Sequence, residues 1–340
     1  MKASRHILAF FAACSLAAIA FAASPYRVIM KVKLPGNGGW DYLSADAQAR
    51  RLYVSHATQV DVVDLDTVKP VGTIPDTPGV HGVAPVPALG RGFISNGKAS
   101  TVTIFDLKTL KKMGDVKAGE NPDAIIFDPA TNRVFAFNGH GKSATVIDAE
   151  KGVAIATIPL AGKPEFAASD GKGHVFVNLE DKNSVTKIDS RELKVEETWP
   201  LPGCEEPGSM AMDVANDRIF IGCGSKVMAA VNAQNGKVIK TLPIGDHVDA
   251  SVFDAEKGLI FNACGDGTLT EIHEDTPDEF TLVENVPTRK GARTVALDSQ
   301  THRLYLVTAD FGPTPAPTAE HPHQRPSIVP GTFVLVVVGQ

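Results

Sequence analysis

The sequence RLYVS at residues 51–55 decides the fold, because the chain repeats it in related forms. The copies return about every forty residues, at 51–55, 91–95, 133–137, 174–178, 218–222, 259–263 and 303–307. Each copy is preceded by a short strand and a turn. It is followed by a third strand that ends in a sequence such as Val-Ile-Asp and by a fourth strand that ends at Pro or Gly. Four short strands per unit at this period are typical of a propeller blade. The seven copies therefore predict an all-β, seven-bladed β-propeller of four-stranded blades.

The last unit lacks a fourth strand, because residues 333–338 run directly into the C-terminus. Residues 26–36 at the other end resemble residues 237–245, which form the expected fourth strand of the fifth unit. We therefore expect the first strand of the mature chain to complete the last blade and close the ring. Residues 24–340 then form a single domain, with blades that start near 40, 80, 121, 163, 206, 247 and 291.

These repeats carry a resemblance to a known family. The phrases RLYV at 51–54, RLYL at 303–306 and NPDA at 121–124 resemble those of the YVTN-repeat (YncE-like) β-propeller family. The resemblance covers roughly residues 26–340 and implies the same seven-bladed fold. It implies no particular reaction, because the matching residues are strand and turn residues and the fold alone does not fix function.

The first 23 residues have the features of a signal peptide. Lys2 and Arg5 precede an apolar stretch at 7–21, and Ala20-Phe21-Ala22 offers a small-x-small cleavage pattern. Cys14 leaves lipidation open as an alternative, although residues 11–14 lack the usual leucine. No apolar stretch reaches the roughly 20 residues of a membrane span. We expect a periplasmic or secreted protein without a transmembrane segment, and a monomer.

The charge of the chain disfavours nucleic acid as a partner. Loss of Lys2 and Arg5 leaves 31 basic and 39 acidic side chains, a net charge of −8 with neutral histidines. Binding to a nucleic-acid backbone needs a concentrated basic face. A small molecule or another protein of the cell envelope is therefore the expected partner.

In a propeller, the first strand of each blade lines the central channel. Counting five residues back from the turn at the end of each first strand gives the channel position of each blade. These positions hold Asp41, His81, Asp123, Glu165, Gly208, Asp249 and Arg293. Six of the seven are charged or ionisable, which the packing of a core does not require. The turn position itself is Asp in every blade but the second, and we interpret it as structural.

Antiparallel pairing predicts that the ends of the second strands lie on the same rim, with His56 across from Asp41. The predicted funnel site comprises Asp41, His56, His81, Asn96, Asp123, Asn138, His140, Glu165, Asp249 and Arg293. Arg293 is its only fixed cation in this interpretation.

Four carboxylates around one channel repel one another unless something offsets their charge. A divalent metal ion would do so, with Asp41, His81, Asp123, Glu165 and Asp249 as candidate ligands. An organic cation, Arg293 or proton uptake are alternatives, as is a water-filled channel whose acids are merely solvated. The leading hypothesis is a binding or interaction protein that recognises a small ligand or protein partner at this face. The alternative is a metal-dependent hydrolase or lactonase, and an accessory role in periplasmic redox metabolism is a third, so whether the protein is an enzyme stays open.

Two further features lie near the same face. A Pro-rich loop at 312–330, inserted in the last blade, carries His321, His323 and Arg325 and is either a lid or an ordinary surface loop. Cys204 and Cys223 are the expected disulfide, which leaves Cys264 free. No Cys-x-x-Cys-His motif is present, so we expect no covalent haem.

Overall fold

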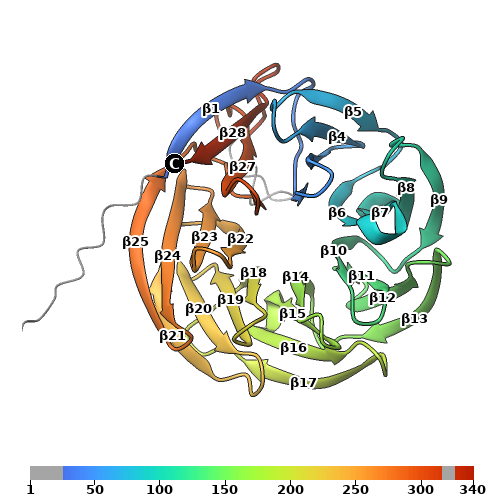
Figure 1. Cartoon of the computed structure of the whole chain (residues 1–340), viewed down its shortest axis with the longest axis vertical. Coiled ribbons are helices and arrows are strands. Elements are labelled where there is room, and N and C mark those ends of the chain that lie inside the picture. Colours follow the sequence, from blue (N-terminus) through green and yellow to red (C-terminus); the bar gives the residue numbers. More distant parts are fainter. Residues whose placement is uncertain (1–25, 316–325) are drawn as a thin grey trace, which may run out of the picture.

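Seven four-stranded antiparallel sheets stand around a central axis in the computed structural model, which describes residues 26–315 and 326–340 (Figure 1). Blades one to three comprise β2(Leu43–Asp46), β3(Arg51–His56), β4(Gln59–Asp64) and β5(Pro70–Ile74); β6(Val80–Val86), β7(Arg91–Asn96), β8(Thr101–Asp106) and β9(Lys112–Lys117); and β10(Pro122–Asp128), β11(Arg133–Asn138), β12(Ser143–Asp148) and β13(Val153–Pro159). Blades four and five comprise β14(Pro164–Ser169), β15(His174–Leu179), β16(Ser184–Asp189) and β17(Lys194–Pro200); and β18(Pro207–Asp213), β19(Arg218–Cys223), β20(Val227–Asn232) and β21(Val238–Pro243). Blades six and seven comprise β22(Val248–Asp254), β23(Leu259–Cys264), β24(Thr268–Thr276) and β25(Glu279–Pro287); and β26(Val295–Asp298), β27(Arg303–Thr308), β28(Val334–Gly339) and β1(Arg27–Lys33). The predicted seven-bladed β-propeller is confirmed.

The two ends of the described chain meet in blade seven. Strand β1 pairs antiparallel with β28, in a register that sets Arg27 against Gly339 and Lys33 against Val334. Figure 1 shows β1 on the outer rim beside β28, next to the C-terminus. The N-terminal strand thus completes the last blade, as the repeat pattern predicts, and hydrogen bonds close the ring without a gap.

The repeated phrase supplies the core of each blade. Its aromatic position is fully buried or nearly so in every copy, at Tyr53, Phe93, Phe135, Phe176, Phe220, Phe261 and Tyr305. These side chains pack between neighbouring sheets, where each large aromatic ring removes much apolar surface from water. The outer strands are more exposed, with large apolar side chains such as Met30, Val71 and Met113 partly in solvent. Stability therefore comes from contacts between blades as well as within them.

Helical structure among the described residues is limited to three short 3-10 turns, η1(Pro87–Leu89), η2(Gly97–Ala99) and η3(Glu180–Lys182). Within residues 26–315 and 326–340, no helix is long and apolar enough to cross a membrane. The predicted signal peptide at 1–23 lies outside the described residues, as do His321, His323 and Arg325 of the Pro-rich loop.

Candidate functional site

Each blade places one half-buried position at the mouth of the central channel, near the start of its first strand. We name this set the axial ring; it consists of Asp41, His81, Asp123, Glu165, Gly208, Asp249 and Arg293. Ion pairs join several of its members across neighbouring blades, and their carboxylates act on one another electrostatically. The structure therefore brings together the first-strand residues that the sequence singles out.

The pairing between the first and second strands is irregular at most of the ring positions. In blades two to six, the register between the first and second strands shifts at the ring position, for example between Val80 and Val83 and between Pro122 and Ile125. A β-bulge of this kind leaves a residue unpaired and re-aims its side chain. Serines of the second strands accept hydrogen bonds from backbone amides at or next to ring positions: Ser55 accepts from the amide of Asp41 at 2.7 Å, and Ser95 accepts from that of Gly82 at 2.9 Å.

His81 forms the centre of one part of the ring. Its Nδ1 lies 2.5 Å from Oδ2 of Asp41 and 3.5 Å from Oδ1 of Asp123. Burial of the ring favours the neutral form, but the hydrogen bonds to Asp41 and Asn121 and the nearby charge of Asp123 raise the pKa of His81 to about 9. At neutral pH His81 is therefore an imidazolium, with Asp41 as its closest counter-ion.

Glu165 and Asp249 each have a cation of their own. Lys163 Nζ lies 2.5 Å from Oε1 of Glu165 and also bonds Glu180, while Arg293 Nε lies 2.7 Å from Oδ2 of Asp249. Burial and the charge of Asp123 nevertheless raise the pKa of Glu165 to about 8. Burial also raises the pKa of Asp249 to about 6, against the opposing effect of Arg293.

Among the residues that the structure describes, Asp123 has no cation to itself. It shares His81 with Asp41, and its distance from the imidazole is the longer of the two. Burial and the negative charge of Asp41 raise its pKa to about 6, although a hydrogen bond to Tyr42 stabilises the charged form. Asp123 is thus the ring carboxylate whose charge is least offset by other side chains.

An apolar cavity of about 200 Å³ lies beyond the ring, deeper in the channel. Its walls come from the residues that follow the ring positions in the first strands of blades one to four: Tyr42, Leu43, Ser44, Gly82, Val83, Ala124, Ile125, Ile126 and Phe166. The ring of Tyr42 packs edge-on against Phe166 at a centroid distance of 4.7 Å. Burial and the surrounding carboxylates, Asp123 first among them, raise the pKa of Tyr42 well above its usual value, so its hydroxyl stays protonated.

Three residues predicted to face the funnel instead point into their own blades. His56 is buried, with its Nδ1 2.8 Å from Oδ2 of Asp61 and its ring against Phe333. The Nδ2 groups of Asn96 and Asn138 donate to third-strand hydroxyls, those of Thr103 at 2.8 Å and Thr145 at 3.1 Å. The structure thus does not bring these three side chains into the axial ring, although regular antiparallel pairing predicts them on its rim.

His140 is the fourth residue that was predicted to face the funnel and lies outside the axial ring. Its side chain is 66% exposed, and the carboxylate of Glu120 at 3.9 Å is its partner rather than any ring residue. It lies on a surface turn outside the axial ring.

The sequence interpretation missed Lys163 and Tyr42. Arg293 is not the only fixed cation of the site, because Lys163 reaches Glu165 from the same strand entrance. The signal was present in Lys163-Pro164-Glu165, where alternate residues lie on one side of an extended chain. Tyr42 directly follows Asp41 and would be expected on the opposite side of a regular strand, so periodicity gave no hint of its place.

Other predicted features lie at the edge of this face. Cys204 and Cys223 form a disulfide, and Cys264 is a buried free thiol whose pKa burial raises to about 12. The described base of the Pro-rich loop folds back on itself, since Phe311 bridges to Ile328 and its ring lies 6.0 Å from that of Trp40.

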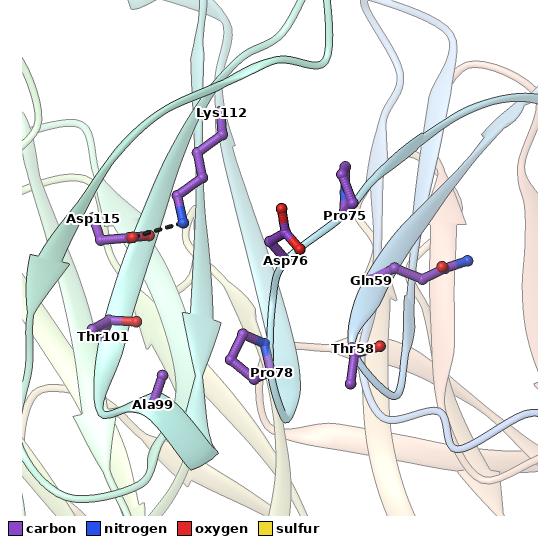
Figure 2. Close-up of a pocket in the computed structure, with 9 residues that line it drawn as sticks. All are labelled: Thr58, Gln59, Pro75, Asp76, Pro78, Ala99, Thr101, Lys112 and Asp115. Carbon is purple, nitrogen blue, oxygen red and sulfur yellow. Dashed lines mark ion pairs between the residues drawn. The ribbon is translucent and has the colours of Figure 1, made fainter.

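A second depression lies between blades one and two, away from the axis (Figure 2). This outer groove has a volume of about 490 Å³ and is lined by Thr58, Gln59, Pro75, Asp76, Pro78, Ala99, Thr101, Lys112 and Asp115. Figure 2 shows Lys112 paired with Asp115 on one wall, at 2.6 Å. That pair neutralises itself, and hydrogen bonds from Lys112 and Thr103 lower the pKa of Asp115 despite its partial burial. The axial ring, with its incompletely offset charges, is the stronger candidate site.

Comparison with known proteins supports the fold alone. No family model matches the chain, and no curated protein matches it in sequence. Among solved structures, a chain of the hydrazine synthase of Kuenenia stuttgartiensis superimposes with a TM-score of 0.71 and 16% identity, over 81% of this chain and 94% of that one. The chain is a seven-bladed β-propeller similar in fold to that neighbour.

Proposed function

We propose that this protein is an exported binding protein that takes a small ligand at the axial ring. The observation that carries the proposal is the convergence of six ionisable side chains, from six blades, above an apolar cavity of about 200 Å³. Ligand sites are typically concave and mostly apolar, with a few polar groups that fix orientation. The perturbed pKa values of Asp123, Glu165 and Asp249 add support, because such groups cluster at functional sites.

Ligand-induced stabilisation tests this function. We would measure the melting temperature of the purified protein against a library of metal ions, amines, carboxylic acids and neutral metabolites, because a ligand that binds only the folded chain raises it. The expected hits lose their effect in Asp123→Asn, whereas Glu120→Gln, an exposed acid outside the ring, retains them. A library without hits, or hits indifferent to Asp123, would count against the ring as the binding site.

A metal-dependent hydrolase is the second candidate, and one cluster favours it. Potential ligand atoms of Asp41, His81 and Asp123 all lie within 4.8 Å of one another. Two carboxylates and an imidazole are a donor set that suits Zn²⁺ and similar ions. The fit is poor in one respect: Nδ1 of His81, the atom that faces both carboxylates, carries a proton at neutral pH, which a metal would have to displace.

Metal analysis separates the two functions. Protein purified without chelator is expected to contain less than stoichiometric metal. A full equivalent that is lost in both Asp123→Ala and Glu165→Ala would instead support the metal-dependent enzyme.

We also propose that residues 1–23 direct export to the periplasm or exterior. The mature protein is then a monomer and a member of the YVTN-repeat family. The basic start, apolar stretch and small-x-small pattern of residues 1–22 support export. Cell fractionation and N-terminal sequencing of the mature chain test the export proposal. We expect the mature chain to start near residue 24. Light scattering tests the monomer.

A further inference from the structure

The unequal pairing of charges in the axial ring points to a class of ligand. We propose that the ring binds a small primary amine, whose ammonium group pairs with Asp123 and whose apolar part enters the axial cavity. This inference rests on the proposed function of the ring and specifies its ligand.

The first argument is the charge left over on Asp123. Lys163 pairs with Glu165 and Arg293 pairs with Asp249, both within 2.7 Å. His81 serves two carboxylates but lies closer to Asp41 than to Asp123. Among the described residues, Oδ1 of Asp123 accepts no hydrogen bond, although it is closed to solvent. A buried acceptor without a donor is costly, and an ammonium group would supply both the donor and the missing charge.

The second argument is the position of the cavity. Asp123 precedes Ala124, Ile125 and Ile126 in β10, and all three line the cavity. A group held at Asp123 therefore stands at the cavity entrance. An apolar cavity of about 150 Å³ holds a benzene molecule. The axial cavity, at about 200 Å³, has room for a phenyl ring or a short branched alkyl group.

The third argument distinguishes an amine from other ions. A metal ion held by Asp41, His81 and Asp123 would have to break the Asp41–His81 pair, whereas an ammonium group at Asp123 leaves that pair in place. An anion placed beside Asp123 would be repelled, because this carboxylate only shares its cation, His81, with Asp41. A quaternary ammonium ion has no N–H group to donate to Asp123, which favours a primary amine over a methylated one.

Calorimetric titration of the full chain with three probes tests this inference. The probes are 2-phenylethylamine, the neutral isostere 2-phenylethanol, and ethylamine, which lacks the ring. We expect 2-phenylethylamine to bind at least about tenfold more tightly than either of the others, because only it uses both Asp123 and the cavity.

Two variants test separately where the ammonium group and the apolar part of the ligand bind. Asp123→Asn should weaken 2-phenylethylamine at least about tenfold and leave 2-phenylethanol unchanged, because it removes the charge and keeps the shape. Ile125→Phe, which fills the cavity, should reduce 2-phenylethylamine to the affinity of ethylamine. Glu120→Gln is the control, and melting curves show whether each variant is folded.

Several outcomes would overturn the inference. Equal binding of the amine and the alcohol would remove the charge argument, and binding unaffected by both variants would place the amine elsewhere. No heat with 2-phenylethylamine up to about 10 mM would refute the amine class outright. If metal ions or acids nevertheless stabilised the protein through Asp123, the ring would remain the ligand site and only the class would be wrong.

Discussion

Arg50 of blade one and Asp298 of blade seven form a two-pronged ion pair, with both N–H···O distances at 2.7 Å. Asp298 is fully buried at its side chain and ends the first strand of its blade, at one of the repeated turn acids. This ion pair links blade one to blade seven, the blade that β1 completes. The pairing lowers the pKa of Asp298 despite its burial, so the carboxylate stays charged in the folded chain.

We predict that Arg50→Ala lowers the free energy of unfolding by about 3 kcal/mol, because it leaves Asp298 buried without its cation. Chemical denaturation measures the change. Lys142→Ala is the control, since its ion pair with Asp181 is largely exposed and worth about 0–1 kcal/mol. Equal losses in the two variants would show that the Arg50 contact has no special role in closing the ring.

A second prediction concerns β1, the strand that closes the ring. Leu34 follows β1, is 4% exposed and packs in the core between blades one and seven. Leu34→Ala should cost about 2–5 kcal/mol, whereas Met30→Ala, at a side chain that is 42% exposed, should change stability by less than about 0.5 kcal/mol. Deletion of residues 26–34 should be worse than either. A deletion that melts at the wild-type temperature would contradict closure by β1.

The axial ring should make stability depend on pH. Glu165 faces Asp123, Lys163, Glu180 and Tyr42, and its pKa rises from 4.5 to about 8 on folding. Unfolding between these pH values releases a proton, so the free energy of unfolding contributed by Glu165 is highest below pH 4.5 and falls toward pH 8.

Glu165→Gln removes this proton, and Lys163 keeps Glu180 as its partner. We expect the variant to match the wild type most closely near pH 5 and to gain about 1 kcal/mol or more relative to it by pH 9. Scanning calorimetry across this range measures the difference. Parallel curves for the two proteins would mean that Glu165 ionises normally.

The cysteines give a chemical prediction. Alkylation of the native protein, mapped by peptide mass spectrometry, should leave Cys204, Cys223 and Cys264 unmodified, because two are bonded and the third is buried. Unfolding without reductant should expose Cys264 alone of these three. Reduction should lower stability by about 3 kcal/mol, as expected for a bridge that spans 19 residues. Labelling of Cys204 in unfolded, unreduced protein would refute the bridge.

The fold could be predicted from the sequence because each blade repeats the same local pattern. The buried aromatic residues, such as Tyr53 and Phe135, recur at one position of one strand, and seven copies reinforce one another. Closure by β1 could be predicted for the same reason, since residues 26–36 match a known unit of the repeat.

The site was less predictable because it depends on departures from regular pairing. A regular ladder would set His56 and Asn96 on the rim, but in the structure their side chains bond to Asp61 and Thr103 of the third strands. Counting along strands identifies which first-strand residues line the channel. It does not reveal which charges pair, and only the structure shows that Asp123 shares its cation with Asp41.

The pairing of β1 with β28 has a consequence for how the protein is made. The first of the described strands, β1, can pair with β28 only after about 300 further residues have been synthesised. Until then β1 has no neighbouring strand, because β28 is the strand with which it pairs, and closing so long a segment is slow compared with forming a local hairpin. A chain that ends before β28 would leave β1 without a partner and β27 with an open edge, and an open strand edge is a template for aggregation.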